Sequence, residues 1–95
     1  MVSIREVAKA SGFSEQTIRR MVLYLLDRMN LSFDEYLAIY LNTESVKIKA
    51  KALEKMIKII EKELDKMPSD EREKFEKLLE HMRAEHGILS TYYRR

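Results

Sequence analysis

The sequence contains no cysteine, a single proline and two glycines among its 95 residues. Without cysteine, the chain can form neither a disulfide framework nor a thiolate metal site. His81 and His86 are its only histidines, which is too few for a zinc site, so we expect no metal and no cofactor. We find no apolar run of the roughly 20 residues that span a bilayer and no signal-peptide core. The sequence therefore predicts a cytoplasmic protein without a membrane partner.

Motifs that bring catalytic groups together are also missing. We find no phosphate-binding loop, no nucleophile elbow and no cluster of metal ligands. Glu80 and Glu85 lie near the two histidines in sequence, but nothing indicates a pocket around them. We therefore expect that the protein is not an enzyme.

The charges that are present are unevenly distributed. Residues 1–30 carry five basic and three acidic side chains, a sum of +2, whereas residues 31–45 carry three acidic side chains and no basic one, a sum of −3. A basic segment beside an acidic one suits a DNA-facing element on a support, although ordinary solvated charge explains the same numbers. The bias toward Lys and Glu is typical of heat-adapted proteins and equally of Lys/Glu-rich coiled coils.

Helix signals predict an all-α fold of four or five helices and no strand. Ser3, Ser14 and Ser32 stand where a side-chain oxygen caps a helix start, and Glu6 and Glu35 would complete capping boxes. Thr43 or Ser45 starts a further helix and Ser69 caps the last one. Gly12 and Gly87 are expected to end the first and last helices, Pro68 to end the fourth, and residues 88–95 to form a frayed tail.

The strongest local pattern runs from Ile4 to Leu23. A helix-turn-helix needs a small residue where its helices cross, a glycine at the turn and a branched apolar residue in the second helix, and Ala8, Gly12 and Ile18 meet these needs. Val7, Phe13 and Met21 are expected to fill the remaining buried positions. With a third helix up to about Leu41, residues 1–42 would form the DNA-binding domain.

This stretch closely resembles the N-terminal helix-turn-helix of lactose-repressor-type and mercury-resistance-type regulators. The resemblance lies in Glu6-Val7-Ala8-Lys9-Ala10, Gly12-Phe13-Ser14, Thr17-Ile18 and Arg20, and it covers about residues 2–29. The chain lacks the sugar-binding domain of the first family and shows no strands for the wing of the second. We therefore expect no effector-sensing function and do not assign a subfamily.

The resemblance implies that the second helix enters the major groove of double-stranded DNA. Gln16 could then bond adenine and Arg20 guanine, while Glu15 would either accept a hydrogen bond from cytosine or repel a phosphate. The residues expected to contact the DNA backbone are Ser3, Ser14, Thr17 and Arg19.

Apolar residues recur in steps of four and three along residues 46–67, which is a heptad seam. Its members are Val46, Ala50, Leu53, Ile57, Ile60, Leu64 and Met67. We expect residues 43–95 to form a helical hairpin that buries this seam against the last helix and a second copy of the chain, giving a homodimeric bundle, although a larger assembly is compatible with it.

Together these features predict a sequence-specific DNA-binding protein, acting as a homodimeric transcriptional regulator. An adaptor in plasmid segregation or phage DNA packaging would need the same site recognition and helical assembly. A helical protein–protein interaction module without DNA binding is the other interpretation.

Overall fold

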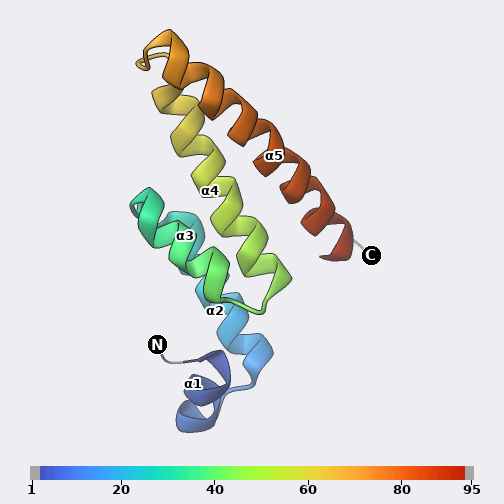
Figure 1. Ribbon diagram of the computed structural model, residues 1–95. Helices are drawn as coiled ribbons and strands as arrows, with labels where there is room; N and C mark the ends of the chain where they lie inside the picture. The colour runs from blue at the N-terminus through green and yellow to red at the C-terminus, as the bar shows by residue number, and fades with distance from the viewer. Residues whose placement is uncertain (1–2, 94–95) are drawn as a thin grey trace. The chain divides into compact units, whose positions relative to one another are not determined.

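The computed structural model describes residues 3–93, and within them it contains helices and no strand, so the all-α prediction is confirmed (Figure 1). The helices are α1 (Ile4–Ser11), α2 (Glu15–Arg28), α3 (Phe33–Asn42), α4 (Val46–Leu64) and α5 (Ser69–Tyr93). Among these residues, no helix has the length and apolar character needed to cross a membrane.

Serine side chains begin most of these helices, as the sequence predicts. Ser3, Ser14, Ser32 and Ser45 each accept a hydrogen bond from the backbone amide three residues later, at 3.1–3.3 Å. Ser32 and Glu35 form the full capping box, in which the Glu35 carboxylate also accepts from the Ser32 amide at 3.2 Å. At the start of α1 the Ser3 half of the expected box is present.

The chain divides into two compact units, residues 1–30 and residues 31–95. The first unit holds α1 and α2, and the second holds α3, α4 and α5. This division falls before α3, whereas the sequence suggested a boundary at residue 42. Three residues, 43–45, separate α3 from α4, and the two helices pack together, which groups α3 with the C-terminal helices.

In the second unit α4 is the central helix, because α3 and α5 both pack against it. Each neighbour is joined to α4 by a short connection, so both run antiparallel to α4 and parallel to each other (Figure 1). A helix with two neighbours must bury more than one stripe of side chains. The buried residues of α4 are Ile48, Ala50, Ala52, Leu53, Met56 and Ile60.

The predicted heptad seam is thus used in part within the chain. Ala50, Leu53 and Ile60 are buried in the second unit, while the other four members are half-buried. The three buried residues do not lie on a surface that a second copy could reach.

Arg72 closes the corner between α4 and α5, a role that the sequence did not indicate. Its guanidinium donates to the backbone carbonyls of Leu64 at 3.3 Å and Met67 at 3.1 Å, and the Leu64 carbonyl also accepts from the Met67 amide at 3.2 Å. The helix ends at Leu64, four residues before Pro68, which has no N–H to donate to the Leu64 carbonyl and whose ring would clash with it in a continued helix.

The expected helix stop at Gly87 is wrong, because α5 continues through this residue to Tyr93. A mid-helix glycine costs about 1 kcal/mol relative to alanine. Leu89 and Ser90, in the next turn, are buried, so packing offsets that cost. The frayed tail expected from residue 88 is likewise replaced by helix up to Tyr93; residues 94–95 lie outside the described residues.

Candidate nucleic-acid interface

The first unit is a corner made by α1, a short turn and α2. Gly12 takes φ = 81° at the end of α1, a left-handed conformation that glycine adopts without strain, and its amide donates to the Ala8 carbonyl at 2.9 Å. The chain leaves the axis of α1 there, and α2 begins after its cap at Ser14. Ala8 and Ile18 are buried, as the sequence predicts for this turn.

The remaining apolar positions of the corner differ from the prediction. Val7, Phe13 and Met21 were expected to be buried, but they are 38%, 55% and 49% exposed. The physical reason is that this unit consists of two helices, and two helices leave one side of each uncovered. A third helix would be needed to bury these side chains.

An ion-paired cluster spans the start of α2. The Glu15 carboxylate binds Arg5 Nε at 3.2 Å and Arg19 Nη2 at 3.3 Å, so one acidic group holds two guanidinium groups. Arg5 and Arg19 keep a net positive charge of one after this pairing. Glu15 therefore serves as an anchor for the two arginines, which leaves less of its carboxylate for a cytosine amino group.

The residues expected to bind phosphate are already part of the helix starts. Ser3 and Ser14 accept hydrogen bonds from backbone amides, and the Ser14 and Thr17 hydroxyls lie 2.9 Å apart. Any phosphate contact by these hydroxyls would come in addition to the capping role.

Gln16 and Arg20 are both exposed on α2 and form no hydrogen bond or ion pair with another residue in the described part of the chain. They are four residues apart, so they lie on one helix face. About two turns beyond Arg20, Arg28 stacks 3.6 Å from the centre of the Tyr24 ring, so this arginine is engaged within α2. Gln16 and Arg20 are the two predicted base-reading side chains that remain available to a ligand.

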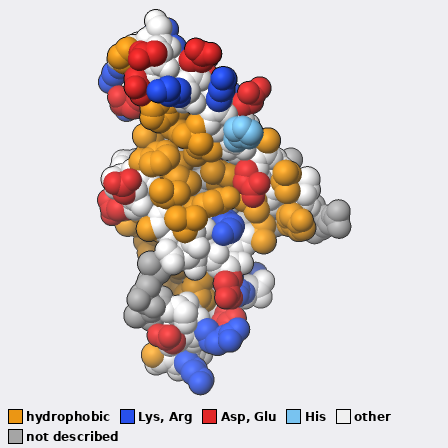
Figure 2. Space-filling model, viewed as in Figure 1, with side chains coloured by type: hydrophobic (Ala, Val, Ile, Leu, Met, Phe, Trp, Pro, Cys, Tyr) orange, Lys and Arg blue, Asp and Glu red, His pale blue; other side chains and the backbone are white. Residues whose placement is uncertain are grey.

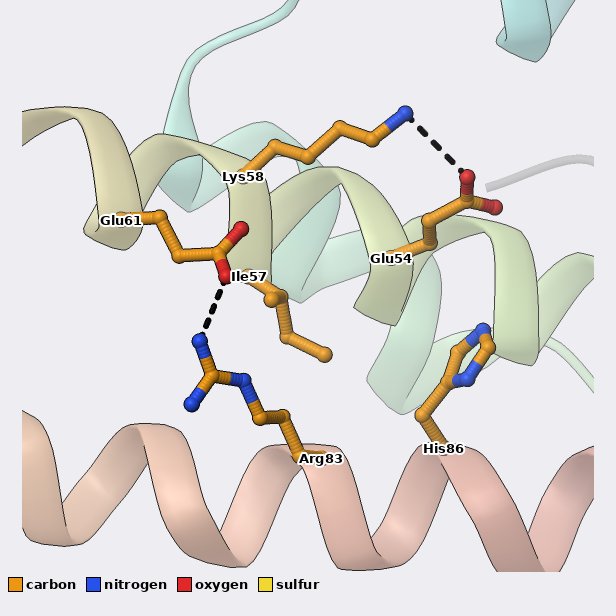
Figure 3. Close-up of a pocket in the computed structure, with 6 residues that line it drawn as sticks. All are labelled: Glu54, Ile57, Lys58, Glu61, Arg83 and His86. Carbon is orange, nitrogen blue, oxygen red and sulfur yellow. Dashed lines mark hydrogen bonds and ion pairs between the residues drawn. The ribbon is translucent and has the colours of Figure 1, made fainter.

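A second polar group lies between α4 and α5, around a cavity of about 230 Å³ (Figure 3). Arg83 of α5 binds the Glu61 carboxylate across the cavity, and Glu54 binds Lys58 at 3.2 Å. Burial raises the pKa of Glu54, but hydrogen bonds from its lysine neighbours outweigh burial and hold this pKa below its usual value. These charges are paired with one another, as in an ordinary solvated helix surface.

The residues considered as an acid–base set are not brought together around this cavity. His86 lines it, whereas Glu85 accepts a hydrogen bond from the Tyr40 hydroxyl of α3. Burial, and then the nearby Glu85 carboxylate, raise the pKa of Tyr40 above its ordinary value. Within residues 3–93 no three His, Asp or Glu side chains lie close enough to hold a metal ion.

The structure thus brings Glu15, Arg19 and Arg5 together at the start of α2 and leaves Gln16 and Arg20 open beside them. The sequence offered Arg5 as a weaker candidate for phosphate contact but did not predict its ion pair with Glu15, which bridges two helices and has no signature in sequence spacing. We found no protein-family model, no curated protein and no solved structure that significantly matches this chain.

Proposed function

We propose that this protein binds double-stranded DNA sequence-specifically through the α1–α2 corner and acts as a homodimeric transcriptional regulator. One observation carries the proposal: the left-handed turn at Gly12 restarts the chain as α2, with Gln16 and Arg20 exposed and unengaged on its first turns. The resemblance of residues 2–29 to repressor headpieces supports the same interpretation.

The chemistry of these side chains fits base recognition. An amide can bond adenine at two atoms and a guanidinium can bond guanine at two atoms, and each contact is worth about 1–3 kcal/mol of discrimination. Arg5 and Arg19, held in place by Glu15, would face the phosphates, where their charge adds affinity without sequence preference. Glu15 would then position these arginines.

Two substitutions test base recognition. Arg20→Ala and Gln16→Ala should each weaken binding to a site selected from a random pool about tenfold or more, since the lost contact is specific. They should weaken binding to random duplex less. Lys62→Ala is the matched control, because Lys62 is an exposed cation on α4, and it should leave site preference unchanged. Equal losses on both DNAs would show that Gln16 and Arg20 do not read bases.

A salt titration tests DNA binding itself. Neutralising phosphates releases counterions, so log affinity for random duplex should fall steeply as log salt rises. Negligible binding with a flat slope would reject the proposal. An adaptor for plasmid segregation or DNA packaging would give the same result, and in vivo reporter expression distinguishes it from a regulator.

The second candidate function is a helical module that docks onto another protein. The exposed side chains of Val7, Phe13 and Met21 favour it, because an open apolar surface is suited to protein contact. In this case Phe13→Ser would abolish binding to the partner protein and Arg20→Ala would not. DNA recognition predicts the opposite outcome.

A further inference from the structure

The second unit leaves large apolar side chains open on α3 and α5. They are Leu37 (36% exposed), Leu41 (65%), Leu78 (42%), Ile88 (54%) and Tyr92 (65%), and we call them the apolar face. Figure 2 shows hydrophobic side chains gathered over the region of α3, α4 and α5 in this view.

A hydrogen bond shows that the two helices present these residues on the same side of α4. The Tyr40 hydroxyl of α3 interacts with the Glu85 carboxylate of α5, so these two positions lie within side-chain reach of each other. Leu37 lies three residues before Tyr40 and Leu41 lies one residue after it. Both leucines are exposed, whereas Tyr36 is buried. On α5, residues 78, 85, 88 and 92 follow steps of seven, three and four, which place them on one stripe.

The open area is what a stable dimer needs. If each of these side chains offers about 150 Å² when fully open, the low end of the range for aromatic side chains, the apolar face presents roughly 400 Å². A standard interface buries about 800 Å² per partner, of which somewhat more than half is apolar, or roughly 450 Å². One copy of the apolar face therefore supplies the apolar part of one side of such an interface.

The charges at the end of the apolar face are complementary between copies. Asp34 extends the Leu37–Leu41 stripe by one turn, and Lys74 extends the α5 stripe beyond Leu78, and both side chains are exposed. Because α3 and α5 are parallel and both residues lie in the N-terminal halves of their helices, before Tyr40 and Glu85, Asp34 and Lys74 lie toward the same end of the unit. A two-fold axis parallel to the helices would place α3 of one copy over α5 of the other, with Asp34 near Lys74.

The charges of α3 disfavour a lipid surface. Peripheral helices use Lys and Arg around their apolar side to bind anionic lipids. The first turn of α3 carries Asp34 and Glu35, and residues 31–45 contain no basic side chain.

We propose that the apolar face of α3 and α5 is the surface through which two copies of this chain associate, with α3 of each copy on α5 of the other. The interface then differs from the heptad seam of α4, whose central residues are buried inside each copy. The inference is independent of DNA binding and is tested on the full chain without DNA.

Light scattering and sedimentation equilibrium at micromolar concentrations should give the mass of a dimer. The double variant Leu41→Lys with Ile88→Lys should weaken the dimer about a hundredfold or more, because each lysine enters the interface twice. Both positions are exposed, so the helical circular dichroism should be kept. Leu25→Lys is the matched control, since Leu25 is 54% exposed but lies on α2, and it should keep the dimer. A monomeric wild type, or a double variant that stays dimeric, would overturn the proposal.

Cysteine placement and a charge exchange test the orientation. Because the chain has no cysteine, Leu41→Cys combined with Ile88→Cys should give a covalent dimer on mild oxidation, and Lys62→Cys on α4 should not. Asp34→Lys and Lys74→Asp should each weaken the dimer a few-fold, and the two together should restore it. If the double variant lost as much dimer affinity as the two single variants together, this arrangement of the copies would be rejected.

Discussion

The two glycines of this chain make a matched test of backbone conformation. Gly12 has a positive φ and Gly87 is inside α5, and a Cβ atom added at either position would meet no other atom within 4 Å. An added methyl group therefore causes no clash at either site, and only the backbone dihedrals distinguish the two sites. Alanine should have opposite effects at them.

At Gly12 an L-residue in the left-handed region costs about 1–2 kcal/mol, and part of that is offset because alanine also restricts the unfolded chain. Gly12→Ala should thus lower the stability of the first unit by about 1 kcal/mol, a fivefold change in its unfolding equilibrium. At Gly87 the dihedrals suit any residue, so Gly87→Ala should raise the stability of the second unit by about 0.5–1 kcal/mol.

Urea unfolding followed by circular dichroism, together with amide hydrogen exchange resolved for each helix, measures both changes. Gly12→Ala should speed exchange in α1 and α2, and Gly87→Ala should slow it in α5. Gly12→Asn should recover about half of the loss, because asparagine tolerates this region better than alanine. If the two alanine variants shifted stability in the same direction, the assignment of Gly12 as the turn that separates α1 from α2 would be refuted.

Three further predictions concern the second unit. The pKa of Glu54 is lowered in the folded state, so its contribution to stability is present above pH 4.5 and is lost as pH falls below that value. Glu54→Gln should therefore flatten the acid side of the stability–pH curve. The pKa of Tyr40 is raised in the folded state, so its contribution to stability is present below pH 10 and is lost as pH rises above 10; Tyr40→Phe should remove this loss in a base titration. Arg72→Ala should cost about 1–2 kcal/mol in urea unfolding, with Arg72→Lys in between, since it removes the guanidinium that bonds the Leu64 and Met67 carbonyls at the corner after α4.

Local signals in the sequence were sufficient for much of the fold. The serine caps and the turn at Gly12 depend on residues that lie within four positions of each other, so their spacing alone specifies them. The helix type of every segment followed from apolar periodicity for the same reason.

The sequence misled where tertiary packing decides. Gly87 has the local signature of a helix end, but burial of Leu89 carries α5 past it. The seam of α4 was expected to pack on the last helix and on a second copy; its buried members lie within the second unit, and periodicity reports that a face is apolar and not which helix covers it. Phe13 was expected to be buried for a similar reason: the pattern assumes a third helix that the first unit does not contain.

The candidate site was only partly predictable. Exposure of Gln16 and Arg20 follows from their positions on an amphipathic helix, whereas the pairing of Arg5 with Glu15 joins side chains ten residues apart across the turn. Contacts of that kind depend on the crossing of α1 and α2, which no spacing rule supplies.

The central place of α4 has a consequence for synthesis on the ribosome. The chain leaves the exit tunnel from its N-terminus, so α3 and α4 emerge while α5 is still enclosed. During that interval α4 has a neighbour along one stripe and open apolar side chains along the other. The core of the second unit can therefore be completed only after α5 has left the tunnel, and a nascent chain with α4 outside and α5 still inside the tunnel should be a substrate for chaperones that bind exposed apolar helices.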